Sequence, residues 1–556
     1  MKKNEKLRNE QIKYYTNMLN EDDILLLKSS DEYFKNHYTS SPLNILTNFS
    51  GTEGEAIIEK NGKITIFVDT RYHILVDKQI FDGIETYKMP LGETFFEAFQ
   101  KKYKKNTKLF VPDDILLSDY LKYDSYFDVR KYSLNEKYSK NSDIDNSKSI
   151  FLVDKKIEKN DFIFKIEKYK KTNSNIEKTV VFNLDEISYL TNLRSFKSKY
   201  SSNFKSILYL DFKNLNYILF VEDFEEVKKI KIEKLNVKPL SEFFSYINSI
   251  ESKVSINFKD ITLNKFLSIK NPIQIKNDNL PLMASVKSKS VIEHLIDSSK
   301  KLDCAILNFK KRLKEGLSEK DLVEIFEEEL IKQGAICPSF KTLLAINENS
   351  ASIHYSSYDA KKILKPESIL LLDCGGYYEA GYATDITRTF YFGSNPKPIH
   401  KKVYTYVLKA FLNCYMSKNT SARELDLMAR KILSPLFEDG FNFNHGLGHG
   451  IGTSVHQNPP RLSNVSKDII KPYQTHSIEP GLYGKSLSTG EEFGVRIENC
   501  VYSDINYNKI SLSKFSFEEV LIDYNLLNIN EIKMLKNWQK DFEWIFKKSQ
   551  VLKITS

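Results

Sequence analysis

Hydrophobic and polar positions alternate in short runs in the first half of the chain and follow longer helical periods later. The runs 64–68 and 206–210 are strand-like and are bounded by turn residues. Residues 290–313 carry apolar side chains at the spacing of one helix face, which predicts a long amphipathic helix. The next helix begins at a capping box, 318–321, and ends at Gly334. Because strands and helices are mixed, the pattern predicts an α/β (α+β) protein.

The length of the chain and its linker-like segments predict several domains. A chain of 556 residues is longer than one ordinary domain, so roughly two to four are expected. A second strand-bearing unit begins near residue 148, and the stretch 271–282, with two prolines, is typical of a linker. We therefore expect domains at 1–147, 148–281 and 282–556.

Glycine and histidine are concentrated in the last half of the chain. No glycine occurs between Gly92 and Gly316, whereas the stretch 375–452 is dense in glycine. Six of the nine histidines lie at or after His354. Tight turns and close approaches of the backbone are therefore expected in the region that also holds the reactive side chains.

Charge and cysteine content exclude several classes of protein. The net charge of +9 comes from lysines interleaved with acids, as in 228–234, so we expect a solvated surface and no nucleic-acid partner. No apolar run approaches about 18 residues and the first residues are charged, so we expect neither a membrane span nor a secretory signal. The five cysteines have no spacing typical of zinc or disulfide frameworks, which favours a reducing, cytoplasmic compartment.

Two aspartates lie at the ends of adjoining strand-like runs. The apolar run 370–372 ends at Asp373 and turns through Gly375 and Gly376, and a second strand begins at Asp385. Each aspartate alone is an ordinary turn residue. At the adjacent ends of a hairpin, however, their two carboxylates can converge on one point.

Histidines and glutamates follow, in a stretch rich in glycine. His445 and His449 alternate with glycines, and His456 lies seven positions beyond His449. Such glycines let the backbone approach another element closely, which suits a crowded pocket. Glu479 ends a strand-like run at Glu-Pro-Gly.

A further strand-like run, 494–499, carries Arg496 and Glu498. Because side chains alternate along a strand, these two are expected on the same face.

Together the motifs supply four carboxylates and one imidazole: Asp373, Asp385, Glu479, Glu498 and His449. Such a cluster cannot be buried without cations, because like charges repel and desolvation is costly. Two divalent metal ions roughly 3.5–4 Å apart would resolve this, as they do in two-metal hydrolases. Oxygen-rich ligation with one histidine suits Mn²⁺, with Zn²⁺ and Co²⁺ as alternatives.

In this order the motifs resemble those of the pita-bread metallopeptidases, and specifically of the aminopeptidase P group. The shared motifs are Asp-X-Gly-Gly…Thr-Asp-Ile-Thr-Arg-Thr, His-Gly-X-Gly-His-Gly-X-Gly, Glu-Pro-Gly-X-Tyr and Gly-X-Arg-X-Glu-Asn. The resemblance implies a pita-bread catalytic domain over 282–556, including a C-terminal extension from about 505 to 556, after two creatinase-like α/β domains. It is strong in the last third of the chain and looser elsewhere.

The same resemblance implies an activity and a set of metal ligands. The implied activity is hydrolysis of the N-terminal Xaa-Pro bond of oligopeptides, with a hydroxide held between two metal ions as the nucleophile. Asp373 would bind one metal, His449 and Glu479 the other, and Asp385 and Glu498 would bridge the two.

Other residues would act on the substrate or on the ligands. Glu479 would also take and pass on the proton of the attacking water. His354 would hold and protonate the substrate, and His456 would stabilise the tetrahedral intermediate. Arg496 would orient a ligand carboxylate, and His445 would support the site without binding metal.

The chain departs from the family pattern at several places, among them the following two. The span from Asp373 to Asp385 is one residue longer than usual, so we expect a bulge or a longer turn with both aspartates still inward. The second domain has 194–196 where Arg-Gly-X-Asp is common, which bears on domain or subunit contacts.

Three alternatives stay open. An Xaa-Pro dipeptidase (prolidase) shares the catalytic set, although the middle domain and the C-terminal extension argue against it. Methionine aminopeptidase shares the ligands but is usually a single domain of about half this length. A catalytically silent pita-bread scaffold is disfavoured because every expected ligand is present. From the aminopeptidase P group we also expect peptide substrates with proline second and a homodimer.

Overall fold

The computed structural model describes residues 2–29, 42–138, 145 and 147–554. These residues form two compact units, one of 1–152 with 160–283 and the other of 153–159 with 284–556. Each unit is described by itself.

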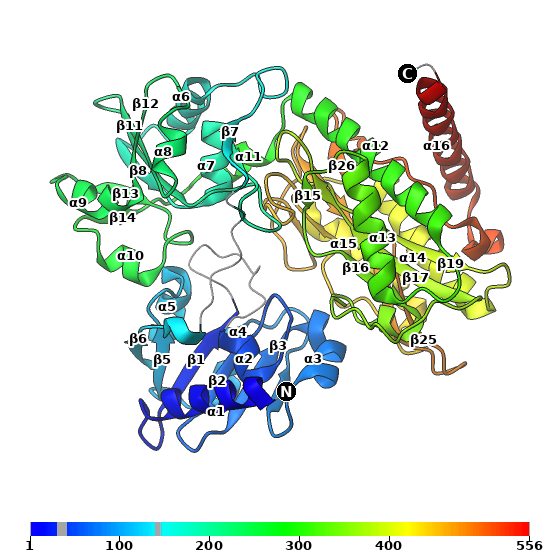
Figure 1. The fold of residues 1–556 in the computed structure, drawn as a ribbon, viewed down its shortest axis with the longest axis horizontal. Helices are drawn as coiled ribbons and strands as arrows, with labels where there is room; N and C mark the ends of the chain where they lie inside the picture. Colours follow the sequence, from blue (N-terminus) through cyan, green and yellow to red (C-terminus); the bar gives the residue numbers. More distant parts are fainter. Residues whose placement is uncertain (1, 30–41, 139–144, 146, 555–556) are drawn as a thin grey trace. The chain divides into compact units, whose positions relative to one another are not determined.

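The first unit contains two six-stranded sheets, the first of which lies in the blue part of the ribbon in Figure 1. Strand β1 pairs antiparallel with β2 and parallel with β5, so the sheet is mixed. Its strands, in sheet order, are β4 (Glu85–Lys88), β3 (Ile64–Val68), β2 (Glu55–Glu59), β1 (Ile24–Lys28), β5 (Lys108–Pro112) and β6 (Asp128–Tyr132). Its helices are α1 (Lys2–Thr16), α2 (Pro42–Thr47), α3 (His73–Gln79), α4 (Phe95–Lys102) and α5 (Leu117–Asp124).

The second sheet of this unit lies between residues 178 and 274. Its strands, in sheet order, are β12 (Leu235–Pro239), β11 (Asn216–Val221), β10 (Ser206–Asp211), β8 (Lys178–Val181), β13 (Val254–Ile256) and β14 (Pro272–Gln274). A separate pair joins β7 (Ile150–Leu152) to β9 (Leu193–Ser195). The helices are α6 (Phe162–Thr172), α7 (Leu184–Thr191), α8 (Phe224–Val227), α9 (Phe243–Asn248), α10 (Leu263–Leu267) and α11 (Leu280–Ser285).

Apolar side chains of both sheets meet in one core. Leu26 and Ile57 of the first sheet belong to the same buried cluster as Ile207 and Ile256 of the second. On the other face of the first sheet, the alternate residues pack in a second cluster that includes Leu27. Because strands point side chains to both faces in turn, a sheet buried on both sides needs continuous apolar runs.

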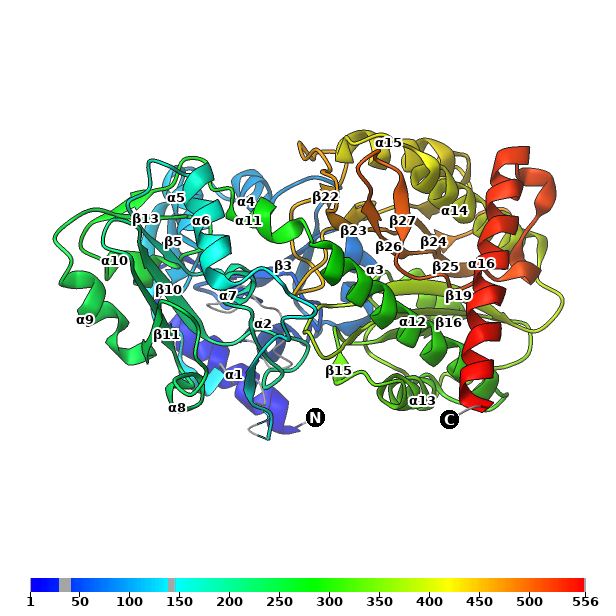
Figure 2. The same cartoon turned by 90° about the horizontal axis from the view of Figure 1, so that it is seen from above.

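The second unit places helices on two sides of three small sheets, as Figure 2 shows. The sheets are β16-β17-β19, β20-β24-β25 and β23-β26-β27. The bounds are β16 (Leu343–Ile346), β17 (Ser368–Cys374), β19 (Ile386–Phe392), β20 (Phe441–Asn442), β23 (Thr475–Ile478), β24 (Gly481–Lys485), β25 (Glu492–Arg496), β26 (Asn499–Ser503) and β27 (Lys509–Ser511). Short pairs join β15 (Cys337–Pro338) to β18 (Gly376–Tyr377) and β21 (Gly448–His449) to β22 (Arg461–Leu462).

Two hydrophobic cores attach the helices to these strands. Helices α12 and α13 pack against the sheet that contains β17. Helices α14 and α15 pack against the two sheets that contain β23 and β25. The helices are α12 (Lys289–Arg312), α13 (Glu319–Lys332), α14 (Pro398–Met416), α15 (Ala422–Leu433) and α16 (Ile529–Ile554). The strands are therefore held between two layers of helix.

Several local predictions are confirmed. The predicted strands 64–68 and 206–210 are β3 and β10, and the predicted long helix is α12. The capping box is present at α13. The Ser318 hydroxyl accepts a hydrogen bond from the amide of Asp321, and the Asp321 carboxylate accepts one from the amide of Ser318. Cys374 and Cys500 are buried free thiols.

The predicted linker at 271–282 is wrong. Its first part forms β14, which pairs with β13, and its last part opens α11. Pro272 is tolerated because it is the first residue of an edge strand, where a missing N–H leaves little of the ladder unsatisfied.

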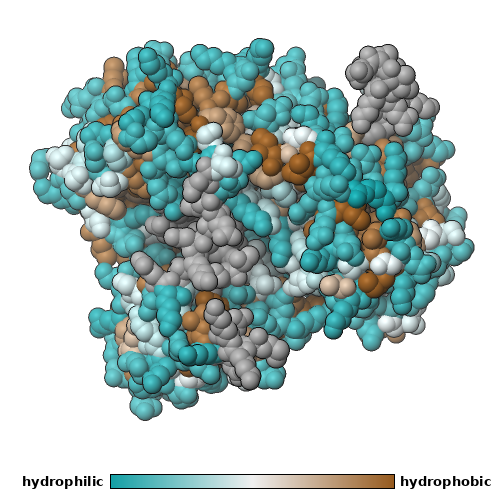
Figure 3. All heavy atoms as spheres, viewed as in Figure 1, coloured by the Kyte–Doolittle hydropathy of each residue, from teal (hydrophilic) through white to brown (hydrophobic). Residues whose placement is uncertain are grey.

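The surface of the protein agrees with the prediction that charged side chains are exposed to solvent. Hydrophilic residues cover most of the face drawn in Figure 3, with apolar residues in small groups between them. Among the described helices, none combines the length and the apolar character needed to cross a bilayer.

Candidate metal centre

Asp373 and Asp385 lie at one end of a regular antiparallel pair. β17 and β19 pair without interruption, with Asp373 opposite Thr387, and Asp385 immediately precedes β19. The extra residue lies in the connection between β17 and β19, where β18 pairs with β15. Of the two expected arrangements, the structure therefore shows the longer turn and not the bulge. A Cβ at Gly375 would collide with the carbonyl oxygen of Thr384, which explains the glycine at this turn.

His449 is placed by a close approach of two backbones. Its amide donates to the Ser477 hydroxyl at 3.0 Å. A Cβ at Gly448 would collide with the carbonyl oxygen of Ser477, so the glycine lets β21 lie against β23. Glu479 follows β23, and its amide donates to the carbonyl oxygen of Leu447 at 2.8 Å. The predicted close approach is confirmed.

Glu498 lies two residues beyond the end of β25, so the prediction that it stands on the strand itself is wrong. Its side chain nevertheless points the same way as that of Arg496. The Thr387 hydroxyl donates to Glu498 Oε2 at 2.7 Å and accepts from Arg496 Nε at 3.1 Å. The Glu498 amide also donates to the Thr387 carbonyl oxygen at 3.1 Å, which fixes it against β19.

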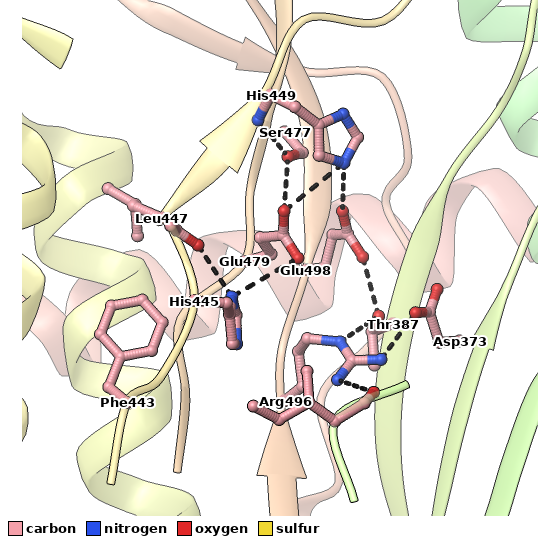
Figure 4. A network of polar contacts seen from close by, with 12 residues as sticks. Asp373, Thr387, Phe443, His445, Leu447, His449, Ser477, Glu479, Arg496 and Glu498 are labelled. Atoms are coloured by element: carbon pink, nitrogen blue, oxygen red, sulfur yellow. Dashed lines mark hydrogen bonds and ion pairs between the residues drawn. The ribbon is translucent and has the colours of Figure 1, made fainter. Parts of the chain in front are cut away.

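These segments bring one imidazole and three carboxylates together. Figure 4 shows His449, Glu479 and Glu498 of this group. His449 Nε2 lies 3.5 Å from Asp385 Oδ2, 3.4 Å from Glu479 Oε1 and 4.0 Å from Glu498 Oε1. Ligand atoms of Asp385, His449 and Glu498 all lie within 4.8 Å of one another. Such a group can hold a metal ion.

Arg496 connects the fourth carboxylate to the others. Its Nη2 donates to Asp373 Oδ2 at 2.6 Å and its Nη1 donates to the Tyr483 hydroxyl at 2.8 Å. Through Thr387 it is also linked to Glu498. One guanidinium group therefore orients two carboxylates from segments far apart in the sequence.

Repulsion among the carboxylates dominates the electrostatics of the site. Burial and the nearby charge of Glu498 raise the pKa of Asp385 well above its usual range. Burial and the charges of Glu479 and Asp373 do the same to the pKa of Glu498. The positive charge of Arg496 does not offset this repulsion, because the pKa values of Asp385 and Glu498 are raised even with Arg496 present.

Three buried carboxylate oxygens provide a direct test of whether cations fit here. Asp373 Oδ1, Asp385 Oδ1 and Glu498 Oε1 accept no hydrogen bond from any described residue. Buried oxygens of this kind are destabilising unless a cation or a donor reaches them. The oxygen-rich donor set with one histidine nitrogen therefore fits divalent metal ions.

The other predicted histidines lie around this group. His445 Nε2 lies 2.8 Å from the Tyr483 hydroxyl, and its Nδ1 lies 4.0 Å from Glu479 Oε2. His456 is exposed, and its ring packs edge-to-face on that of His449 with centroids 4.4 Å apart. His354 is half-buried and follows Ile353, whose carbonyl oxygen accepts from Arg496 at 3.3 Å.

Two residues of the Thr-Asp-Ile-Thr-Arg-Thr motif were missed as parts of the site. Thr387 stands two positions after Asp385, so strand alternation could have placed it on the same face. Arg388 points the other way and donates to the Glu498 carbonyl oxygen at 2.7 Å and to the Asn499 side chain at 2.9 Å. Burial lowers the pKa of Arg388 to about 10.

Replacing Thr387 with valine keeps the shape of the side chain but removes its hydroxyl. Glu498 then loses a donor and Arg496 an acceptor, so we expect metal affinity to fall by roughly 10- to 100-fold, as for other outer partners of metal ligands. Metal titration by calorimetry measures this. Thr405→Val is the matched control, because Thr405 is buried in α14 and its hydroxyl contacts the 521–523 backbone. Equal affinity in both variants would contradict the role assigned to Thr387.

Comparisons with known proteins agree with this geometry. A probable Xaa-Pro aminopeptidase P of Laccaria bicolor is 25% identical over 550 residues, covering 89% of this chain and 83% of that protein. Among solved structures, an X-prolyl aminopeptidase from Caenorhabditis elegans matches with a TM-score of 0.82 at 19% identity, covering 95% of this chain and 92% of the other. At this identity the likeness establishes the fold, an α/β protein whose C-terminal part is a pita-bread domain.

The family follows from two further matches. The sequence model of metallopeptidase family M24 matches residues 293–503, which include all five predicted ligands. An uncharacterized peptidase of Methanocaldococcus jannaschii is 30% identical over 364 residues, covering 63% of this chain and 96% of that protein. With a relative of this identity matched over nearly its whole length, the chain belongs to metallopeptidase family M24.

Proposed function

We propose that this protein is a metal-dependent aminopeptidase that hydrolyses the N-terminal Xaa-Pro bond of oligopeptides. The observation that carries the proposal is the convergence of Asp385, His449 and Glu498 around buried carboxylate oxygens that lack donors. The likeness to aminopeptidase P proteins over nearly the whole chain supports the choice of substrate. A scaffold without activity would have no need for such a destabilising cluster.

The proposed ligands divide between two divalent ions. Asp373 would bind one ion, His449 and Glu479 the other, and Asp385 and Glu498 both. When bound, the ions would polarise the substrate carbonyl and make water acidic enough to react at neutral pH. The C. elegans protein is described as having a di-nuclear active site, which supports the count of two.

Glu479 is the carboxylate best placed to move a proton. Its side chain is 18% exposed, against 4% for Asp385 and 2% for Glu498. The Ser477 hydroxyl donates to Glu479 Oε1 at 3.3 Å and so orients the carboxylate. Glu479 would take the proton of the attacking water and pass it towards the leaving proline nitrogen.

The exposed rim of the site would contact the substrate. His456, exposed beside His449, would donate to the oxygen that develops negative charge. His354 would hold and protonate the substrate from the segment next to Ile353. Arg496 would keep Asp373 oriented, and His445 would support Glu479 and Tyr483.

Finer properties are proposed on the same basis. Mn²⁺ is the favoured metal because the ligands are mostly carboxylate oxygens, with Zn²⁺ and Co²⁺ as alternatives. The resemblance to aminopeptidase P supports a homodimer and the division 1–147, 148–281 and 282–556. The description of the C. elegans protein as cytosolic supports a cytoplasmic location.

A substrate comparison tests the activity. With Mn²⁺ present, an Xaa-Pro-Xaa tripeptide should be cleaved faster than an Xaa-Pro dipeptide, and a Met-Ala peptide should be left intact. Release of the first residue is measured by chromatography. Cleavage of the dipeptide alone would identify a prolidase, and loss of methionine alone would identify a methionine aminopeptidase. No cleavage of any peptide by metal-loaded protein would favour the scaffold.

Removing a bridging ligand tests the site. Asp385→Asn and Glu498→Gln should each lower kcat/KM and the amount of bound metal. The loss should exceed the roughly 10- to 100-fold loss that is typical when a residue hydrogen-bonded to a metal ligand is replaced. Activity assays and elemental analysis measure the two losses. Glu328→Gln removes a charge from the exposed ion pair with Lys332 on α13 and should change neither. Near-normal turnover in either bridging variant would refute the ligand assignment.

The pKa shifts predict how metal and pH act together on stability. Asp385 and Glu498 have pKa values in the metal-depleted folded protein above those of the unfolded chain. Between those values the folded state binds more protons, so the free energy of unfolding falls as pH rises. Divalent ions replace the protons, so added Mn²⁺ should raise the Tm more at about pH 8 than at about pH 6. Calorimetry measures the shifts, and equal shifts at both pH values would count against the prediction.

A further inference from the structure

Two residues of the sequence motifs have no direct part in the proposed metal binding. Arg388 belongs to the Thr-Asp-Ile-Thr-Arg-Thr motif and Asn499 to the Gly-X-Arg-X-Glu-Asn motif. Both side chains are buried, with 1% and 0% of their surface exposed. A buried polar side chain is destabilising unless its donors and acceptors are bonded, so the partners of these two residues show what each of them holds.

The guanidinium group of Arg388 uses all five of its N–H donors. The acceptors are four backbone carbonyl oxygens and one side-chain oxygen, each 2.7–3.0 Å from the donor nitrogen. They are the carbonyl oxygens of Thr387, Glu498, Phe515 and Ser516 and the side-chain oxygen of Asn499. Because the guanidinium fork is planar and rigid, it holds β19, residues 498–499 and residues 515–516 relative to one another.

These bonds fix the peptide groups on both sides of Glu498. The Glu498 amide donates to the Thr387 carbonyl oxygen at 3.1 Å, and its carbonyl oxygen accepts from Arg388 Nη1 at 2.7 Å. Thr387 and Arg388 follow Asp385 at the start of β19, so both proposed bridging ligands are tied to one strand. Rotation of either peptide group would move the Glu498 carboxylate away from its present position.

Asn499 extends the network to the segment 511–516. Its Nδ2 donates to Ser511 Oγ at 3.0 Å and to the Ser513 carbonyl oxygen at 3.2 Å, while its Oδ1 accepts from Arg388. The Asn499 side chain therefore joins β19 to this segment. The segment lies beyond residue 503, where the match to the M24 sequence model ends.

Helix α12 fixes the path of the segment 511–516. The carboxylate of Asp303, a buried residue of α12, accepts from the Ser513 hydroxyl at 2.6 Å and from the Lys514 amide at 2.9 Å. The backbone is thus held immediately before the two carbonyl groups that bind the guanidinium.

Helix α16 contributes a further contact. Trp538 Nε1 donates to the Phe515 carbonyl oxygen at 3.0 Å, and the same oxygen accepts from Arg388 Nη2 at 2.8 Å. A carbonyl oxygen has two lone pairs, so it can accept both bonds. One carbonyl group therefore connects α16 to the arginine that holds Glu498.

We propose that Arg388, Asn499, the segment 511–516 and Trp538 form a clamp that positions Glu498 as a metal ligand. The inference rests on the proposed function, because it concerns the proposed bridging ligand. The clamp acts through the Glu498 backbone and contributes no ligand of its own. It makes the geometry of the metal centre depend on the part of the chain that follows the family match.

Calorimetric titration of Mn²⁺ into the metal-depleted full chain tests the proposal. Arg388→Lys keeps the charge, but an ammonium group has three donors and no planar fork, so it cannot hold all the acceptors. We expect Mn²⁺ affinity to fall by roughly 10- to 100-fold, as for other residues that support metal ligands. Arg194→Lys is the matched control, because Arg194 is buried in the first unit and donates to the carbonyl oxygens of Ser188 and Leu193. Both variants should lose stability, and only Arg388→Lys should lose affinity.

A second pair of variants tests the contribution of α16 and keeps the proposal testable if Arg388→Lys does not fold. Trp538→Phe keeps an aromatic ring but removes the donor to Phe515, so Mn²⁺ affinity should fall, by less than in Arg388→Lys. Phe411→Leu is the matched control, because the Phe411 ring packs against that of Trp538 with centroids 5.8 Å apart and carries no polar atom. It should lower the Tm and leave the affinity unchanged.

Electron paramagnetic resonance gives a readout that a loss of packing alone would not change. Two Mn²⁺ ions that share carboxylate ligands are magnetically coupled, and ions without shared ligands are not. At equal Mn²⁺ occupancy, Arg388→Lys and Trp538→Phe should show more uncoupled Mn²⁺ than the parent, because Glu498 is displaced. Arg194→Lys and Phe411→Leu should give the spectrum of the parent.

The proposal is overturned if Arg388→Lys or Trp538→Phe binds Mn²⁺ with the affinity and the spectrum of the parent. It is also overturned if the two controls weaken binding as much as the clamp variants do. The titrations need no substrate, so they decide the proposal even if no Xaa-Pro peptide is cleaved. A parent that binds no Mn²⁺ would overturn the proposal together with the proposed function.

Discussion

The repulsion among four carboxylates, three of them buried, is the constraint on which the second unit depends. Asp373 lies on β17, and the other three acids lie in segments next to strands; three of the carboxylate oxygens accept no hydrogen bond from any described residue. Arg496 supplies one positive charge, bonded to Asp373, and leaves the pKa values of Asp385 and Glu498 raised. Divalent ions are the natural counter-charge, so metal binding and the stability of this unit are coupled.

The backbone and side chains around the carboxylates hold them in place despite this repulsion. Gly375 and Gly448 allow backbones to approach at positions where any side chain would collide. Arg388, on the opposite face of β19 from Thr387, holds the backbone of Glu498 and the side chain of Asn499. The ligands are therefore fixed by rigid strands, with the helices α12 to α15 packed outside them. A site on strands held in this way keeps its geometry when the charge within it changes.

The same physical problem occurs in the first unit. Lys28 neutralises Glu55 and Asp119 directly. For Glu186 and Asp260, burial and the charges of neighbouring acids instead raise the pKa of each carboxyl group. In both units a buried acid either meets a positive partner or has a raised pKa.

The sequence by itself determined the elements and residue types that local patterns encode. Helix periodicity predicted α12, a capping box predicted the start of α13, and four contiguous motifs supplied the proposed ligands. It failed at 271–282, because the pairing of β14 depends on a neighbouring strand and not on its own prolines. Only the tertiary structure decided that the Thr387 hydroxyl donates to Glu498, 111 positions away. That contact depends on which strands are neighbours, and that choice is made by packing of the whole unit.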